Sequence, residues 1–275
     1  MLAREEYVEQ AYFFRALRER MAQSIAAQEL LDTLKQELLS TTRLPWAIDF
    51  LSSELRLTGG FASAMERMEH YFTPFQTFVI REAEKDTGRF DFRIGLEILE
   101  READYRAKSP TPQGTFFYQF ETLCRNRLGY DHGLEAIAGD PIFDESWRDW
   151  ILTVRRQVGL IDFGDMIHVR SEHYVRGPND PDRPVLFGDK EGRIAVAHCR
   201  RDPLYLFASL QRHLGYPSVP RPVKGDQPYL IPVMQQRIDR LELRIRLLEE
   251  ELRGGINLSK FYARENEPDE PPEIQ

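Results

Sequence analysis

Cysteine, lysine and long apolar runs are all scarce in this sequence of 275 residues. Cys124 and Cys199 form no CxxC pair, so neither a disulfide framework nor a cysteine-based zinc or redox motif is expected. No apolar run approaches the roughly 20 residues that a membrane helix needs. The N-terminal stretch MLAREEYVEQAYFF has acids where a signal peptide would need basic and then apolar residues. We therefore expect a cytoplasmic protein without a membrane segment.

Sequence motifs for catalysis and for nucleotide binding are also missing. The chain has no GxSxG, no GxxxxGK and no GxGxxG, which are typical of hydrolases, phosphate-binding loops and dinucleotide sites. Acids outnumber Lys and Arg by 45 to 37, and the net charge of −8 gives no overall attraction to nucleic acid. We expect no cofactor and no metal, and the sequence leaves open whether the protein is an enzyme.

Apolar residues recur at steps of three and four through the first half of the chain, which is typical of packed helices. Residues 4–39 contain neither proline nor glycine, and Ala11, Phe14 and Leu17 share one face. Further helices are predicted at 45–58, from residue 61 onward, at 90–107, at 116–128 and around 147–158. Pro74 should kink or split the helix that begins at residue 61, because it cannot donate to the preceding turn. The acids and arginines between the apolar positions are interpreted as solvated, ion-paired faces. Residues 1–157 are therefore predicted to form a helical body.

The pattern changes near Gly159, where short segments rich in β-branched and aromatic residues alternate with turn residues. VLFGDKEGRIAVA indicates a hairpin that turns at Asp189–Gly192, and a helix should follow from Asp202 to Gly215. We predict a small antiparallel α+β module at 158–215 and a proline-rich linker at 216–228. A coiled-coil assembly helix at 229–253 and a short segment with a disordered acidic tail at 254–275 should complete a mainly α fold.

The polar residues of the predicted strands are candidates for chemistry. Alternation places His168 and Glu172 on one strand face, and His198 could join them from a neighbouring strand. Two imidazoles and a carboxylate can bind a metal or act as acid and base. The catalytic candidates are His168, Glu172, His173 and His198. A solvated outer sheet face explains the same residues, and no ligand spacing such as HExxH accompanies them.

Basic residues gather between Arg193 and Lys224. Arg200 and Arg201 immediately precede a predicted helix start, where free N–H groups attract anions, so they form a candidate anion site. The alternative is a salt-bridged face, which the negative charge of the whole chain favours. Nucleic acid is accordingly not an expected partner.

A heptad repeat near the C-terminus predicts self-association. Its seam alternates steps of three and four through Ile231, Met234, Ile238, Leu241, Ile245, Leu248 and Leu252. In a parallel pair, Arg237 would face Glu242 of the partner helix and Arg244 would face Glu249, and both contacts are attractive. Packing onto its own chain is the alternative.

These patterns favour a non-enzymatic, homo-oligomeric scaffold or adaptor that pairs with itself in parallel through residues 231–252. One alternative is an enzyme, or a binder of a metal or small ligand, that uses His168, Glu172 and His198. A second is a nucleic-acid-associated regulator that uses the arginine stretch 193–224.

Overall fold

The computed structural model describes residues 1–21, 27–85, 90–177 and 183–221. This part of the chain forms twelve helices and no sheet, which confirms the predicted mainly α fold. Its only β-type pairings are two isolated bridges, Val158–Ile161 and Ser171–Phe187. None of the helices found here is long and apolar enough to cross a membrane.

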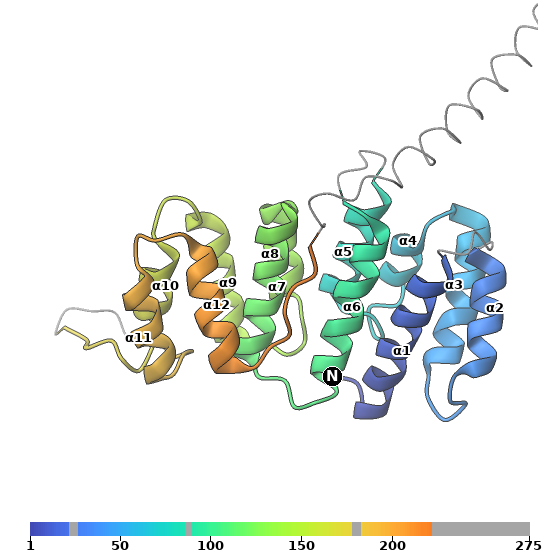
Figure 1. Ribbon diagram of the computed structural model, residues 1–275, viewed down its shortest axis with the longest axis horizontal. Helices are drawn as coiled ribbons and strands as arrows, with labels where there is room; N and C mark the ends of the chain where they lie inside the picture. The colour runs from blue at the N-terminus through green and yellow to red at the C-terminus, as the bar shows by residue number, and fades with distance from the viewer. Residues whose placement is uncertain (22–26, 86–89, 178–182, 222–275) are drawn as a thin grey trace, which may run out of the picture. The chain divides into compact units, whose positions relative to one another are not determined.

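The helices lie in one compact unit, Met1–Pro222, and share a continuous hydrophobic core. In chain order they are α1 (Arg4–Met21), α2 (Ala27–Glu37), α3 (Leu44–Thr58), α4 (Phe61–Glu66), α5 (Pro74–Glu84), α6 (Phe92–Arg106), α7 (Pro112–Asn126), α8 (Tyr130–Ala138), α9 (Glu145–Gln157), α10 (Phe163–His168), α11 (Asp189–His198) and α12 (Pro203–Leu214). Helices α1–α6 gather at one end of this unit and α7–α12 at the other (Figure 1). The heptad seam from 231 to 252 and the acidic tail lie outside the described residues.

Several helices begin or end at the prolines and glycines from which their ends were predicted. Pro45 lies in the first turn of α3, where its missing N–H does no harm. Gly59 ends α3 with φ 77°, a left-handed conformation that suits glycine, and its N–H donates to the carbonyl of Leu55. Pro74 begins α5, so the prediction that the helix from residue 61 would be kinked or split there is confirmed as a split.

The segment DHGLEAIAGDP lies between two of the predicted helices, yet it contributes most of helix α8. Gly133 is an unusual residue inside a helix, because glycine lowers helix propensity. A Cβ atom there would lie 2.7 Å from Cδ1 of Leu123 on α7. The glycine therefore permits the close packing of α7 and α8, and this packing outweighs the poor local propensity.

The predicted α+β module at 158–215 is wrong within the described residues, which contain no strands there. The segment assigned to the hairpin contains α11, and His168, which was placed on a predicted strand, is the last residue of α10. Gly192, placed in the hairpin turn, lies inside α11, where a Cβ would fall 2.2 Å from Oγ of Ser171. The glycine thus allows Ser171 to approach α11 closely. The strand assignment was wrong because short runs with β-branched residues, such as RIAVA, fit either a strand or a buried helix.

The chain beyond α12 crosses back over the unit, as Figure 1 shows in orange up to Arg221. Tyr216 is buried and its hydroxyl donates to Oε2 of Glu121 at 2.8 Å. The amide of Asn126 donates to the carbonyl of Pro220 at 3.1 Å. The first residues of the predicted proline-rich linker therefore pack against α7.

Candidate protein-binding groove

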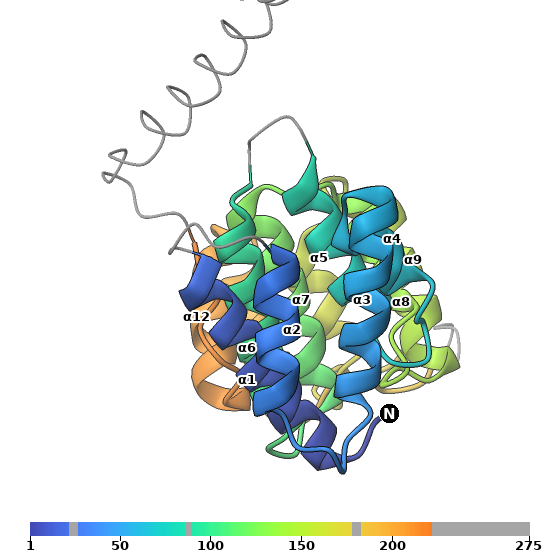
Figure 2. The same ribbon diagram turned by 90° about the vertical axis from the view of Figure 1, so that its right-hand side faces the viewer.

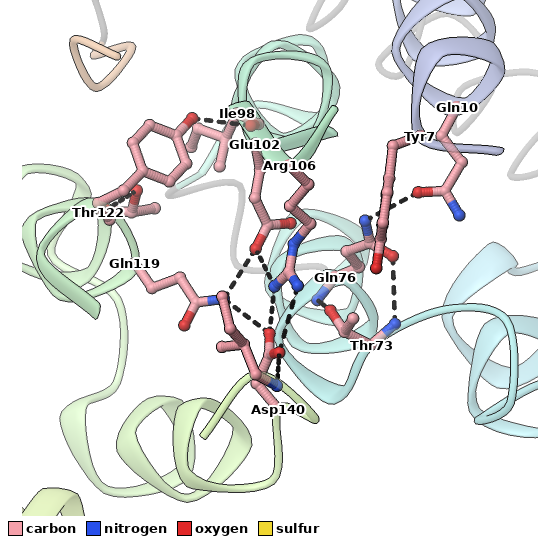
Figure 3. A network of polar contacts seen from close by, with 12 residues as sticks. Tyr7, Gln10, Thr73, Gln76, Ile98, Glu102, Arg106, Gln119, Thr122 and Asp140 are labelled. Atoms are coloured by element: carbon pink, nitrogen blue, oxygen red, sulfur yellow. Dashed lines mark hydrogen bonds and ion pairs between the residues drawn. The ribbon is translucent and has the colours of Figure 1, made fainter. Parts of the chain in front are cut away.

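The most deeply buried charges form a network at the centre of the unit. Arg106 of α6 donates to Glu102, one turn earlier, at 2.9 Å and also contacts Asp140 after α8. Gln119 of α7 donates to both carboxylates, at 2.7 and 2.9 Å. Figure 3 shows these side chains converging from three segments. The interpretation of every such i, i+4 pair as solvated is wrong here, because all four side chains are buried.

This network has one cation for two carboxyl groups. Burial raises the pKa of Glu102, and the proximity of Asp140 raises it further, although Arg106 opposes both effects. A protonated Glu102 would leave Arg106 and Asp140 as a neutral pair. Because none of these side chains reaches solvent, a substrate has no access to them. The network therefore holds α6, α7 and the end of α8 together and is not an active site.

The histidines of the predicted strand face lie instead in and after α10. The ring centroids of His168 and His173 are 5.8 Å apart, so the structure brings these two candidates together. Nδ1 of His173 lies 3.0 Å from Oδ1 of Asp189. Glu172 accepts a hydrogen bond from the backbone N–H of Asp189 at 3.2 Å. These contacts attach the loop after α10 to the first turn of α11.

The remaining sequence candidates lie at the junction of α11 and α12. Nε2 of His198 is 3.0 Å from Oγ of Ser209 on α12, so its contact differs from those of the α10 histidines. Arg200 and Arg201 are exposed. The backbone N–H of Arg200 donates to the carboxylate of Asp162 at 2.8 Å, so an acid of the chain already occupies that donor.

Three possible metal-ligand atoms, from Asp162, Asp165 and Cys199, lie within 4.8 Å of one another. Asp162 caps α10 by accepting from the N–H of Gly164, and the Cys199 thiol donates to Asp165 at 3.2 Å. Burial and the hydrogen bond to Asp165 raise the pKa of Cys199 to about 11. A metal would have to displace the proton of this thiol, and the raised pKa makes that displacement more costly. Helix capping and hydrogen bonding account for the cluster.

A wide groove lies beside α2 and α3, with a volume of about 1020 Å³. This α2–α3 groove is lined by Lys35, Gln36, Leu38, Ser40, Thr42, Arg43, Pro45, Trp46, Ala47, Asp49, Phe50, Arg67, Met68, His70 and Tyr71. Figure 2 shows α2 and α3 side by side at this end of the unit. The volume lies at the upper end of the range of ligand sites.

Buried acids of α1 fix the loop that forms one side of the α2–α3 groove. Glu9 accepts from the N–H of Leu39 at 3.0 Å, and Glu6 accepts from the N–H of Arg43 at 2.8 Å. The hydroxyl of Tyr71 donates to Glu6 at 2.8 Å from the floor of the groove. Burial and this bond raise the pKa of Tyr71, so it remains a donor. The groove is therefore preformed by hydrogen bonds across three segments.

The lip of the groove carries an exposed aromatic side chain. Trp46 is 85% exposed, although α3 buries Leu44 and Ile48 in the core on its other face. Phe50 and Leu57 follow Trp46 at steps of four and seven, so α3 has a second apolar stripe. This stripe is the signal in the sequence that could have revealed the site, and we did not identify it there. An amphipathic helix needs only one apolar face to join a core.

A smaller hollow of about 530 Å³ lies between α5 and α8. Four glutamates line it, namely Glu66, Glu69, Glu82 and Glu135, together with Arg81, Lys85 and His132. Arg81 pairs with Glu66 at 2.7 Å. Acids therefore outnumber permanent cations in this hollow, whereas cations outnumber acids in the α2–α3 groove.

Comparisons with protein-family models, with curated proteins and with solved structures found no match to this chain.

Proposed function

We propose that the protein is a non-enzymatic scaffold that binds a segment of another protein in the α2–α3 groove. The observation that supports this most is Trp46, which is 85% exposed beside a preformed groove. Burying a side chain of this size would contribute on the order of 1.5–3 kcal/mol. Tryptophan is also enriched among the residues that dominate protein interfaces. The groove thus offers an anchor with a fixed surface beside it.

Self-association through residues 231–252 remains part of this proposal, with the cytoplasm as the expected compartment. A parallel dimer would carry two copies of the groove. Two grooves would bind a bivalent partner more tightly than either groove alone, because the second contact becomes intramolecular. Such an arrangement suits an adaptor better than an enzyme.

Selection of peptides from a displayed random library on the full-length chain would test the groove. Selected peptides should bind the wild type and lose about tenfold in affinity on Trp46→Ala, which is the loss expected for about 1.4 kcal/mol. Leu160→Ala is the matched control, because Leu160 is 84% exposed and lies outside the groove. Both substitutions are at the surface and should leave the melting temperature nearly unchanged.

Tryptophan fluorescence supplies a direct readout of the same site. Trp147 and Trp150 are only 5% and 3% exposed, so quenching by acrylamide should report mainly on Trp46. A bound peptide should protect Trp46 from the quencher. Selected peptides that bind Trp46→Ala as well as wild type, or that leave Trp46 fully accessible, would contradict the proposed function.

A further inference from the structure

We infer that the segment recognised by the α2–α3 groove is acidic and carries bulky apolar side chains. This inference rests on the proposed function and adds the chemistry of the partner. Three permanent cations, Lys35, Arg43 and Arg67, line the groove, whereas Asp49 is its only acid. The sign of this charge is opposite to that of the whole chain, whose net charge is −8.

The cations differ in how far the chain itself neutralises them. Nζ of Lys35 contacts both carboxylate oxygens of Asp49 at 2.6 Å, and Arg67 pairs with Glu54 at 2.5 Å. The Arg43 side chain is exposed and has no ion pair with any acid of the described residues. An incoming carboxylate would therefore find Arg43 uncompensated.

The apolar part of the surface lies directly beside these charges. Arg43 precedes Trp46 by one helical turn, and the Arg67 guanidinium lies over the Phe50 ring at 5.3 Å. From Trp46 to Leu57 the exposed stripe of α3 extends about 16 Å, the length of three helical turns. A partner segment of that length can place apolar side chains on Trp46 and Phe50 and a carboxylate toward Arg43.

The neighbouring hollow between α5 and α8 increases the expected difference in binding between acidic and basic segments. Its four glutamates outnumber its two permanent cations, Arg81 and Lys85, so the hollow would repel an acidic segment and attract a basic one. An acidic segment should therefore bind beside Trp46, while a basic segment that bound the hollow would leave Trp46 accessible.

The test uses the full-length chain and three labelled peptides of about twelve residues, matched in length to three helical turns. The first has glutamates around two leucines, the second has lysines in place of the glutamates, and the third has glutamines there. The first should bind and protect Trp46 from acrylamide, about tenfold more tightly than the second. Its affinity should fall as salt rises from about 50 to 300 mM.

Charge reversal at one residue distinguishes recognition of an acidic segment from non-specific peptide binding. Arg43→Glu should weaken the glutamate peptide about tenfold and improve the lysine peptide. Arg148→Glu is the control. It changes the net charge by the same amount as Arg43→Glu, and Arg148 is an exposed residue of α9 outside the groove.

The outcomes distinguish the two proposals. Equal binding of the glutamine peptide, with Trp46 protected, would overturn the acidic partner and leave the groove function intact. An equal loss on Arg148→Glu would also overturn the acidic partner. Protection of Trp46 that rises with protein concentration without peptide would assign the groove to a second copy of the chain and overturn this inference. Failure of both these peptides and the selected peptides to protect Trp46 would overturn both proposals.

Discussion

Removing the guanidinium of Arg106 would leave Glu102 and Asp140 inside the protein without their cation. Arg106→Ala should therefore lower the free energy of unfolding by about 3–5 kcal/mol, the usual cost of breaking a buried ion pair. It also removes the contact with the Tyr7 ring, whose centroid lies 5.9 Å away. Urea denaturation would measure the loss.

Lys108→Ala is the matched control for Arg106. Lys108 also pairs with an acid four residues earlier, Asp104, but both side chains are more than half exposed. Its loss should cost less than about 1 kcal/mol. Equal effects of the two substitutions would show that the central network does not depend on its buried charge.

The raised pKa of Glu102 makes a second prediction at the residue scale. Because burial raises its pKa in the folded state, the folded chain holds this proton at pH values where the unfolded chain has lost it. Wild-type stability from this group therefore falls as pH rises above about 4.3, the ordinary pKa of glutamate.

Glu102→Gln removes this titration while keeping the shape of the side chain. The stability of the variant relative to wild type should therefore improve between pH 4 and pH 8, by at most about 1.4 kcal/mol per pH unit. Urea denaturation at several pH values would follow the difference. A difference that stays constant from pH 5 to pH 8 would mean that the folded protein does not raise the pKa of Glu102.

The sequence contained a signal for this network. Glu102 and Arg106 continue the stripe that begins with Gly95 and Leu99, at steps of four, three and four, so they occupy core positions of α6. The i, i+4 spacing of opposite charges alone cannot show this, because the exposed pair Asp104–Lys108 has the same spacing. Burial depends on what packs against the helix, and spacing does not encode that.

At the scale of elements, the capping box of α5 links local structure to packing. The Thr73 hydroxyl accepts from the N–H of Gln76, whose side-chain oxygen accepts from the N–H of Thr73. The Gln76 amide then donates to Gln10 of α1 at 3.2 Å. One cap therefore orients a buried contact between two helices.

Thr73→Ala should destabilise the protein by about 1 kcal/mol, since it removes the oxygen that caps α5. For a unit of this size the melting temperature should fall by about 2–4 °C. Thr73→Ser keeps the hydroxyl and should retain most of the stability. If serine were as damaging as alanine, the methyl packing of Thr73 would matter more than its cap.

Elements marked by proline, glycine and strong 3–4 periodicity were predicted well, as α3 and the start of α5 show. The segments around α10 and α11 were not, because β-branched residues in short runs fit either a strand or a buried helix. Gly164 and Gly192 decide the outcome through tertiary contacts: a Cβ on Gly164 would lie 2.9 Å from the carbonyl of Ala195. Such close approach between helices cannot be predicted from local composition.

At the scale of the whole molecule, the mainly helical class was predictable, whereas the groove was not. The groove forms because Glu6 and Glu9 of α1 hold the loop before α3 by hydrogen bonds. Glu6 and its partner Arg43 are more than thirty residues apart in the sequence. Of the groove, only the exposure of Trp46 could have been predicted from the sequence, because Trp46 belongs to the second apolar stripe of α3. The assembly of the chain rests on residues outside the described part and remains a prediction.

That prediction concerns the heptad seam from Ile231 to Leu252. If it pairs two chains, each aliphatic side chain that it buries contributes on the order of 1.5–3 kcal/mol. Replacing Ile238 and Ile245 by lysine should therefore release monomers and leave the helical unit folded. Light scattering would measure the mass, and circular dichroism would confirm the fold.

Leu243→Lys with Leu247→Lys is the matched control, because it adds the same charge to positions away from the seam. In a parallel pair this variant should remain dimeric, since Leu243 and Leu247 lie neither on the seam nor among the charged positions that flank it. If the repeat packs onto its own chain, the wild type should be monomeric at tens of micromolar. A monomeric wild type, or a seam variant that unfolds, would remove self-association from the scaffold proposal while leaving the test of the groove unaffected.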